Sequence, residues 1–143
     1  MKKKFLSIVF IFNILYNVNA QKLDLRDVPP AVKAKFTILY PRETKVKWGK
    51  EKNNYEAEFE FKEAELSVLI DPQGNLIQTE TKLKIDKLPK KVLDYISINK
   101  DGEKIKEAAK VIDTAGVKSF EVELKDTDLF FDHKGEFIKE ERN

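Results

Sequence analysis

The sequence YEAEFEFKEAELSVLIDPQGNLIQTE, from Tyr55 to Glu80, decides the fold. Its first part alternates apolar residues with glutamates at 56, 58 and 60, and apolar residues recur at every second position from Leu66 to Ile70. This period of two is typical of strands with one buried face and one solvated face. Asp71-Pro72-Gln73-Gly74 predicts a tight turn, because proline fixes one dihedral angle and glycine accepts the left-handed conformation. We therefore expect three antiparallel strands here.

The end of this stretch recurs near the C-terminus as LFFDHKGEFIKEE, Leu129 to Glu141. Other features recur in the same order, and matched features in one order indicate a duplication. The corresponding pairs are Asp71 and Asp132, Gly74 and Gly135, Pro29 and Pro89, Val32 and Val92, Tyr55 and Phe120, and Phe59 and Leu124.

Each of the two units is expected to begin with a helix. In the first, Asp27 is a candidate N-cap, Val32, Phe36 and Leu39 form an apolar stripe, and Tyr40-Pro41 ends the helix. The second helix begins at Leu88-Pro89 and carries Val92, Tyr95 and Ile96. Strands are expected at residues 44–48, 55–61, 66–70, 76–86, 104–112, 120–124, 129–131 and 137–138.

The two units predict an α+β fold with one continuous antiparallel sheet. About 60 residues cannot bury much apolar surface alone, so both helices are expected on one face of a shared sheet. The predicted organisation is a signal peptide at 1–20, a lead segment at 21–26, repeat 1 at 27–86 and repeat 2 at 87–143.

The N-terminus has the layout of a signal peptide. Three lysines precede an apolar run from Phe5 to Tyr16, and Ala20 provides the small residue of a cleavage site. The run is shorter than the roughly 20 apolar residues that span a bilayer. We expect cleavage after Ala20 and a periplasmic or secreted mature protein that does not contact a membrane.

Charge and cysteine content exclude several kinds of partner and site. The chain has 27 basic and 25 acidic residues, and without the three lysines of the leader the net charge is 24 − 25 = −1. Lysine and glutamate are interspersed without a basic block, so nucleic acid is not an expected partner. The absence of cysteine excludes disulfides, thiolate chemistry and zinc sites built on sulfur.

No residue set predicts catalysis, a metal site or a cofactor. His133 is the only histidine and lies in a predicted turn, which leaves no nucleophilic triad. The two Asp-x-x-Gly turns lack the alternating acids of a calcium loop. We interpret Glu56, Glu58 and Glu60 as a solvated row, paired across the sheet to lysines such as Lys82 and Lys84, rather than as acid–base catalysts.

Four aromatic residues are candidates for partner binding. Trp48 has two possible roles: its indole completes the core under a helix, or it forms an exposed patch with Tyr40 and Tyr55, of the kind that anchors protein interfaces. Phe130 is opposite in phase to its neighbours and is a second candidate for an exposed contact.

These residues resemble the PepSY-like family, small exported bacterial proteins also described as beta-lactamase-inhibitor-like. The resemblance rests on Val28-Pro29, Tyr40-Pro41, Val46-Lys47-Trp48, Tyr55 to Phe59 and Ile70 to Gly74, with Leu88-Pro89 and Phe131 to Gly135 as a second copy. It implies tandem units as in the beta-lactamase inhibitory protein, whose concave sheet face binds an enzyme. The second copy lacks the Tyr-Pro helix end and has Ala108-Ala109 near the expected position of a tryptophan.

We therefore expect an exported, non-enzymatic module that binds a protein or peptide on the sheet face away from the helices, such as an inhibitor or modulator of an extracytoplasmic protein. The alternative is a small-ligand carrier with a pocket between helices and sheet, lined by Trp48 and phenylalanines. An enzyme is the third hypothesis, and it would depend on Glu58 or His133.

Overall fold

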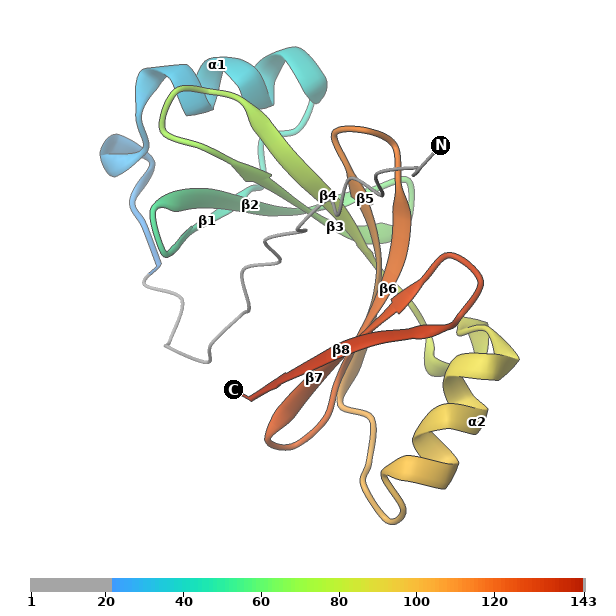
Figure 1. Cartoon of the computed structure of the whole chain (residues 1–143). Coiled ribbons are helices and arrows are strands. Elements are labelled where there is room, and N and C mark those ends of the chain that lie inside the picture. Colours follow the sequence, from blue (N-terminus) through green and yellow to red (C-terminus); the bar gives the residue numbers. More distant parts are fainter. Residues whose placement is uncertain (1–21, 143) are drawn as a thin grey trace, which may run out of the picture.

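The computed structural model describes residues 22–142, and the predicted signal peptide lies outside this range. Within it, eight strands form one antiparallel sheet in which each strand pairs with its neighbour in the sequence (Figure 1). The strands are β1 (Lys47–Glu51), β2 (Asn54–Phe61), β3 (Ala64–Ile70), β4 (Leu76–Lys82), β5 (Glu107–Asp113), β6 (Lys118–Glu123), β7 (Thr127–Asp132) and β8 (Phe137–Arg142).

The order of elements repeats once along the chain. A 3-10 helix (Leu25–Asp27), helix α1 (Pro30–Leu39) and four strands are followed by a second 3-10 helix (Ile85–Lys87), helix α2 (Lys90–Asn99) and four more strands. The two halves lie end to end, with α1 and α2 at opposite ends of the twisted sheet (Figure 1). The pairing of β4 with β5 joins them. The predicted α+β fold with two tandem repeats and one sheet is confirmed.

The strand register places both helices on the same face of the sheet. Val68 belongs to the core cluster under α1 and pairs with Thr79, which in turn pairs with Ile112 on β5. Ala108 lies four residues before Ile112, hence on the same face, and belongs to the core cluster under α2. The opposite face, which we call the open face, is covered by neither helix.

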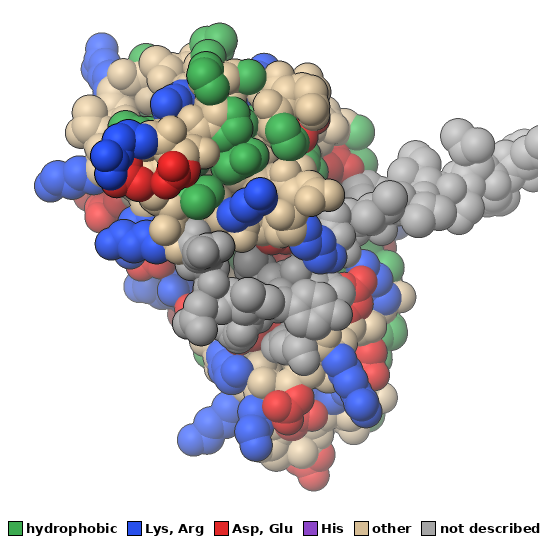
Figure 2. Space-filling model, turned by 90° about the vertical axis from the view of Figure 1, so that its left-hand side faces the viewer, with side chains coloured by type: hydrophobic (Ala, Val, Ile, Leu, Met, Phe, Trp, Pro, Cys, Tyr) green, Lys and Arg blue, Asp and Glu red, His purple; other side chains and the backbone are tan. Residues whose placement is uncertain are grey.

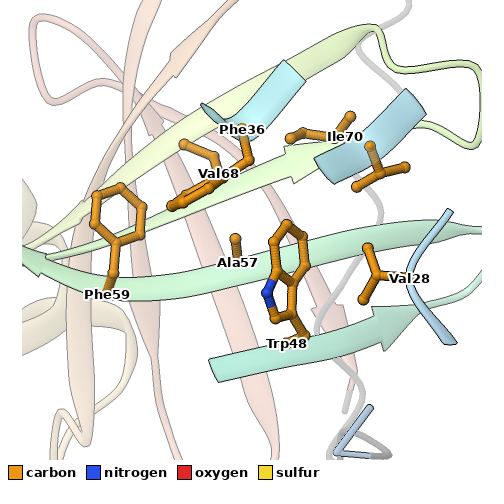
Figure 3. Packing of buried hydrophobic residues seen from close by; sticks show 8 residues of the cluster. Val28, Phe36, Trp48, Ala57, Phe59, Val68 and Ile70 are labelled. Atoms are coloured by element: carbon orange, nitrogen blue, oxygen red, sulfur yellow. The ribbon is translucent and has the colours of Figure 1, made fainter. Parts of the chain in front are cut away.

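Trp48 is part of the core of the first repeat. Its side chain is 7% exposed and its ring centroid lies 5.4 Å from that of Phe36 on α1 in an edge contact (Figure 3). Ala57, Val68 and Ile70 from the sheet pack in the same cluster. The first of the two roles considered for Trp48 therefore describes its position. In the second repeat Ala108 takes the equivalent place and is also buried.

The Asp-x-x-Gly segments are hairpin turns held by the aspartate side chain. Asp71 Oδ1 accepts hydrogen bonds from the amides of Gln73 and Asn75 at 2.9 and 2.8 Å. Asp132 Oδ1 accepts the equivalent bonds from Lys134 and Glu136 at 2.8 and 2.9 Å. A third turn of the same kind begins at Asp113. The carboxylates are thus engaged with the backbone, as the turn interpretation predicts.

Several predicted boundaries differ from the structure. The first strand is Lys47–Glu51 rather than residues 44–48, because Gly49 continues the pairing with Glu56 instead of starting a turn. The strand expected at 76–86 ends at Lys82, where the chain enters the second 3-10 helix. Asp27 does not cap α1: it lies in the first 3-10 helix, and Pro29 precedes α1 without a side-chain cap.

Candidate functional site on the open face

The open face is rich in carboxylates because every second residue of the sheet points away from the helices. The register places Glu58 beside Ser67, Ser67 beside Glu80 and Glu80 beside Val111. Further along the sheet, Glu121 on β6 pairs with Phe130 on β7. Apart from the turn aspartates Asp113 and Asp132, the acidic side chains of this face are Glu51, Glu56, Glu58, Glu60, Glu65, Glu80, Glu107, Glu121, Glu123, Asp128 and Glu141.

Four of these glutamates, which we call the glutamate cluster, act on one another: Glu51, Glu56, Glu80 and Glu121. Burial, with the negative charges of Glu56 and Glu80, raises the pKa of Glu51 to about 8. Burial and the charge of Glu56 raise the pKa of Glu80 to about 7, although Gln78 Nε2 donates a 2.6 Å hydrogen bond to it. Their strands β1, β2, β4 and β6 therefore bring like charges together across the sheet.

The pKa values of the other two members, Glu56 and Glu121, are also raised by burial. Burial raises the pKa of Glu56, and a hydrogen bond from Ser67 opposes this shift. Burial and the charges of Glu80 and Asp128 raise the pKa of Glu121 well above its usual range. The charge of Lys52 lowers the pKa of Glu51, but burial and the neighbouring negative charges outweigh it.

Lysines form salt bridges with several of the carboxylates around the cluster. Lys82 Nζ lies 3.2 Å from Glu65 and 3.1 Å from Glu107. Lys106 pairs with Glu123, and Lys139 pairs with Glu141. Among residues 22–142, no salt bridge involves a member of the glutamate cluster. The expected pairing of the glutamate row with Lys82 and Lys84 is therefore wrong in detail, since Lys82 binds Glu65 and Glu107.

Three buried apolar residues lie between the carboxylates in the register of the open face. Leu69 pairs with Glu56, Val111 pairs with Glu80, and Phe130 pairs with Glu121, so each apolar residue lies beside one member of the cluster. A hollow of about 890 Å³ opens over the sheet, lined by residues of both repeats that include Glu58, Glu80 and Glu121. The walls of this hollow carry both acidic and basic side chains, among them Glu58, Glu80 and Lys82.

The four aromatic candidates separate into two groups. Trp48, Tyr40 and Tyr55 lie on the helix side, where Tyr40 packs 4.5 Å from Phe59 and Tyr55 is half-buried with the Lys50 amine 5.7 Å from its ring. Phe130 lies on the open face, as its phase predicts, but it is only 2% exposed and the Lys139 amine lies 4.7 Å from its ring centroid. Only Phe130 therefore belongs to the open face.

Sequence reasoning found the glutamate row but not the cluster. Glu58 and Glu60 are exposed, as expected, whereas Glu56 is 7% exposed and departs from the expected solvated row. Glu51, Glu80 and Glu121 lie 29 to 70 positions apart in the sequence, and only the pairing of β4 with β5 brings the two repeats together. The sequence signal that could have found these residues is the alternation of buried and exposed positions along each strand, followed through both repeats as far as Glu121.

A second exposed surface lies outside the sheet, on the helices. Figure 2, which faces the side of the molecule that carries α1, shows hydrophobic side chains gathered together with lysine and arginine around them. Ile38 on α1 and Ile98 on α2 are 74% and 78% exposed and occupy equivalent positions in the two repeats. This surface supplies matched control positions for tests of the open face.

The space between α1 and the sheet is filled by side chains. Phe36 lies 5.1 Å from Phe59 and 5.6 Å from Tyr40, ring centroid to ring centroid, so aromatic groups occupy the position of the pocket that a carrier would need (Figure 3). Within the described range, no group of three metal-ligating side chains is placed to hold an ion. None of the helices between residues 22 and 142 has the length and hydropathy of a membrane span.

Three solved structures share the fold. A DUF2874 family protein of Bacteroides ovatus superposes with a TM-score of 0.69 at 21% identity, over 81% of this chain and 89% of that one. A BLIP-like protein of Bacteroides fragilis gives 0.63 at 23% identity, over 87% and 90%. A "putative periplasmic" protein of Bacteroides eggerthii gives 0.69 at 16% identity, over 80% and 88%.

The sequence itself matches a family twice, once in each repeat. Comparison with curated proteins found no match. The model of the family described as "putative beta-lactamase-inhibitor-like, PepSY-like" matches residues 15–78 and again residues 78–139. These two matches span most of the chain and coincide with two successions of helix and four strands in one sheet. The chain therefore belongs to the PepSY-like, beta-lactamase-inhibitor-like family.

Proposed function

We propose that this protein is an exported, non-enzymatic module that binds a protein or peptide on the open face, as an inhibitor or modulator of an extracytoplasmic protein. The observation that carries the proposal is the arrangement of the sheet. Both helices pack on one face, and the other face carries acidic side chains and a hollow lined by residues of both repeats.

Two further observations support this proposal. The Bacteroides fragilis structure with the same fold is described as BLIP-like, and the Bacteroides eggerthii structure is described as periplasmic. The leader at 1–20, with cleavage after Ala20, would deliver the mature chain to that compartment.

The test is capture of a partner from periplasmic extract with the protein purified after export. Ala109→Trp adds a neutral, bulky group in the middle of the open face, between Lys82 and Glu121 in the register. Thr37→Trp makes the same addition on the exposed side of α1 and is the matched control. We expect a reproducible partner with the wild type and with Thr37→Trp, and its loss with Ala109→Trp.

Two results would count against the proposal. One is the absence of any reproducible partner. The other is a partner that Ala109→Trp retains and Thr37→Trp releases, which would move the binding surface to the helices.

A further inference from the structure

The outer edge of β8 is a second interaction surface of the protein, separate from the open face. We propose that two copies of the exported chain associate through this edge, with β8 of one copy antiparallel to β8 of the other, so that the two sheets continue as one. This inference goes beyond the proposed partner binding and does not depend on it. The partner at this edge is a second copy of the same chain.

The two edges of the sheet differ. β1 and β8 are its outer strands, so each has one side that faces no other strand. On β1 this side is partly covered, because Leu23 pairs with Trp48 and its amide donates a 2.8 Å hydrogen bond to the Trp48 carbonyl oxygen. No segment within residues 22–142 pairs with the outer side of β8. An outer strand without such a neighbour can bind an added strand through its peptide groups.

The order of charges along β8 favours a second copy as the added strand. The strand reads FIKEER, from Phe137 to Arg142. In an antiparallel pair centred on Glu140, Lys139 of each copy lies opposite Glu141 of the other. Opposite charges in directly opposed positions stabilise such a pair, and like charges destabilise it. The two-fold axis repeats the contact, so one dimer contains this ion pair twice.

Lys139 and Glu141 lie on the same face of the sheet and reach its surface. Lys139 pairs with Phe130 and Glu141 pairs with Asp128 across β7, so both belong to the open face. Their side chains are 29% and 20% exposed and form a salt bridge with each other. Directly opposed residues of an antiparallel pair share a face. The dimer would therefore join two lysines and two glutamates in a ring of alternating charge.

The residue at the centre of this register is compatible with the pairing. Glu140 would lie opposite its own copy, where two carboxylates without cations would repel each other. Lys100, which follows α2, lies 2.6 Å from the Glu140 carboxylate and supplies the cation in each copy. Centring the pair on Glu141 would instead place that carboxylate opposite its own copy and beside Asp128. The charges therefore favour the register centred on Glu140.

This pairing would enlarge the open face. Two antiparallel edge strands of identical copies are related by a two-fold axis that runs perpendicular to the sheet. The same face of both sheets then lies on the same side, so the two open faces join across β8 and the helices of both copies lie on the opposite side.

The first measurement is the association state of the exported wild-type protein by analytical ultracentrifugation over a range of concentrations. We expect a monomer–dimer equilibrium that shifts toward the dimer as the concentration rises. A protein that remains monomeric up to about 1 mM would overturn the inference, because a dissociation constant above that value is too weak for a specific contact. This arm needs no variant.

The second measurement uses two charge reversals, Lys139→Glu and Glu141→Lys, made in separate proteins. Each alone places like charges opposite one another twice, and we expect it to weaken dimer formation at least about tenfold. An equimolar mixture of the two variants restores opposite charges at both positions, and we expect it to form a heterodimer about as tightly as the wild type. Loss of the salt bridge within β8 cannot explain that recovery, because both variants still lack it in the mixture.

The matched control is Lys50→Glu on the other outer strand, β1. We expect it to change dimer formation less than about twofold, because β1 lies outside the proposed contact. Thermal unfolding is measured for every variant, and the wild-type measurement decides alone if one of them does not fold.

Two further results would overturn the inference. One is a wild-type dimer whose dissociation constant neither charge reversal changes, which would place the contact elsewhere on the molecule. The other is a mixture of the two variants that associates no better than either variant alone. Capture of a partner by a protein that stays monomeric would preserve the proposed function while rejecting the pairing of β8.

Discussion

The raised pKa of Glu80 on the open face makes the stability of the protein depend on pH. Its pKa is raised to about 7 in the folded protein from 4.5 in a free side chain. The folded state therefore binds the proton more tightly than the unfolded chain does. The contribution of Glu80 to the free energy of unfolding is most favourable below pH 4.5 and is lost as the pH rises through about 7.

Glu80→Gln is accordingly expected to stabilise the protein at high pH. Glutamine cannot ionise, so its gain over the wild type should be larger at pH 8.5 than at pH 4.5, by up to about 3 kcal/mol. Urea unfolding at the two pH values measures the difference, with Glu63→Gln on the exposed β2–β3 turn as the control. A gain that is equal at both pH values would show that Glu80 is not perturbed in solution.

At the scale of the elements, the hairpin between β3 and β4 docks against the start of α1. Gly74 has a φ of +86°, and a Cβ atom there would lie 2.8 Å from the carbonyl oxygen of Ala31. Gly116 in the β5–β6 turn has a φ of +78°, but an added Cβ would meet nothing within 4 Å. The two glycines share a left-handed backbone conformation and differ in the contact with a helix.

The substitution Gly74→Ala should therefore cost about 2–4 kcal/mol of unfolding free energy, since it adds a backbone clash to the conformational penalty. Gly116→Ala should cost only about 1 kcal/mol, from the left-handed conformation alone. Denaturant unfolding compares the two variants. Equal costs would mean that the hairpin does not press on α1.

The same elements show what the sequence could and could not predict. The turns at Asp71 and Asp132 were predictable because proline, glycine and aspartate act locally. The position of β1 was not predictable from the sequence. Gly49 is a typical turn residue, but in the structure it pairs with Glu56 and continues the strand. The short apolar pattern of residues 104–112 was hard to place, because β5 joins the two repeats and pairs on both sides.

The candidate site was predictable only in part, for a related reason. Period two identified Glu56 and Phe130 as residues of a face opposite to their neighbours, and the register confirms this for both. Which glutamates would be left without a lysine depends on the pairing across four or more strands, which no local pattern encodes. Trp48 remained ambiguous because an amphipathic aromatic suits a core and an interface equally well.

For the whole molecule, the shared sheet predicts that the two repeats unfold together. Pairing of β4 with β5 continues the sheet, and each repeat is small for an independent core. Trp48, the only tryptophan, reports on the first repeat, whereas Val92 on α2 is fully buried in the core of the second.

Val92→Ala should lower the free energy of unfolding by about 2 kcal/mol. Because the repeats unfold together, the Trp48 fluorescence transition and the far-UV circular dichroism transition should both move to the same lower urea concentration. The wild type serves as the reference for both signals. A Trp48 transition that stays at the wild-type midpoint would show that the repeats fold independently.

The most direct measurement of the central claim is site-specific photo-crosslinking in the periplasm of living cells. Benzoylphenylalanine is placed at Ser67 or Ala109 on the open face, and at Thr37 or Ile98 on the exposed sides of the helices. The account predicts the same protein adduct from both open-face positions and none from the helix positions. Adducts from Thr37 or Ile98, with none from Ser67 and Ala109, would contradict it.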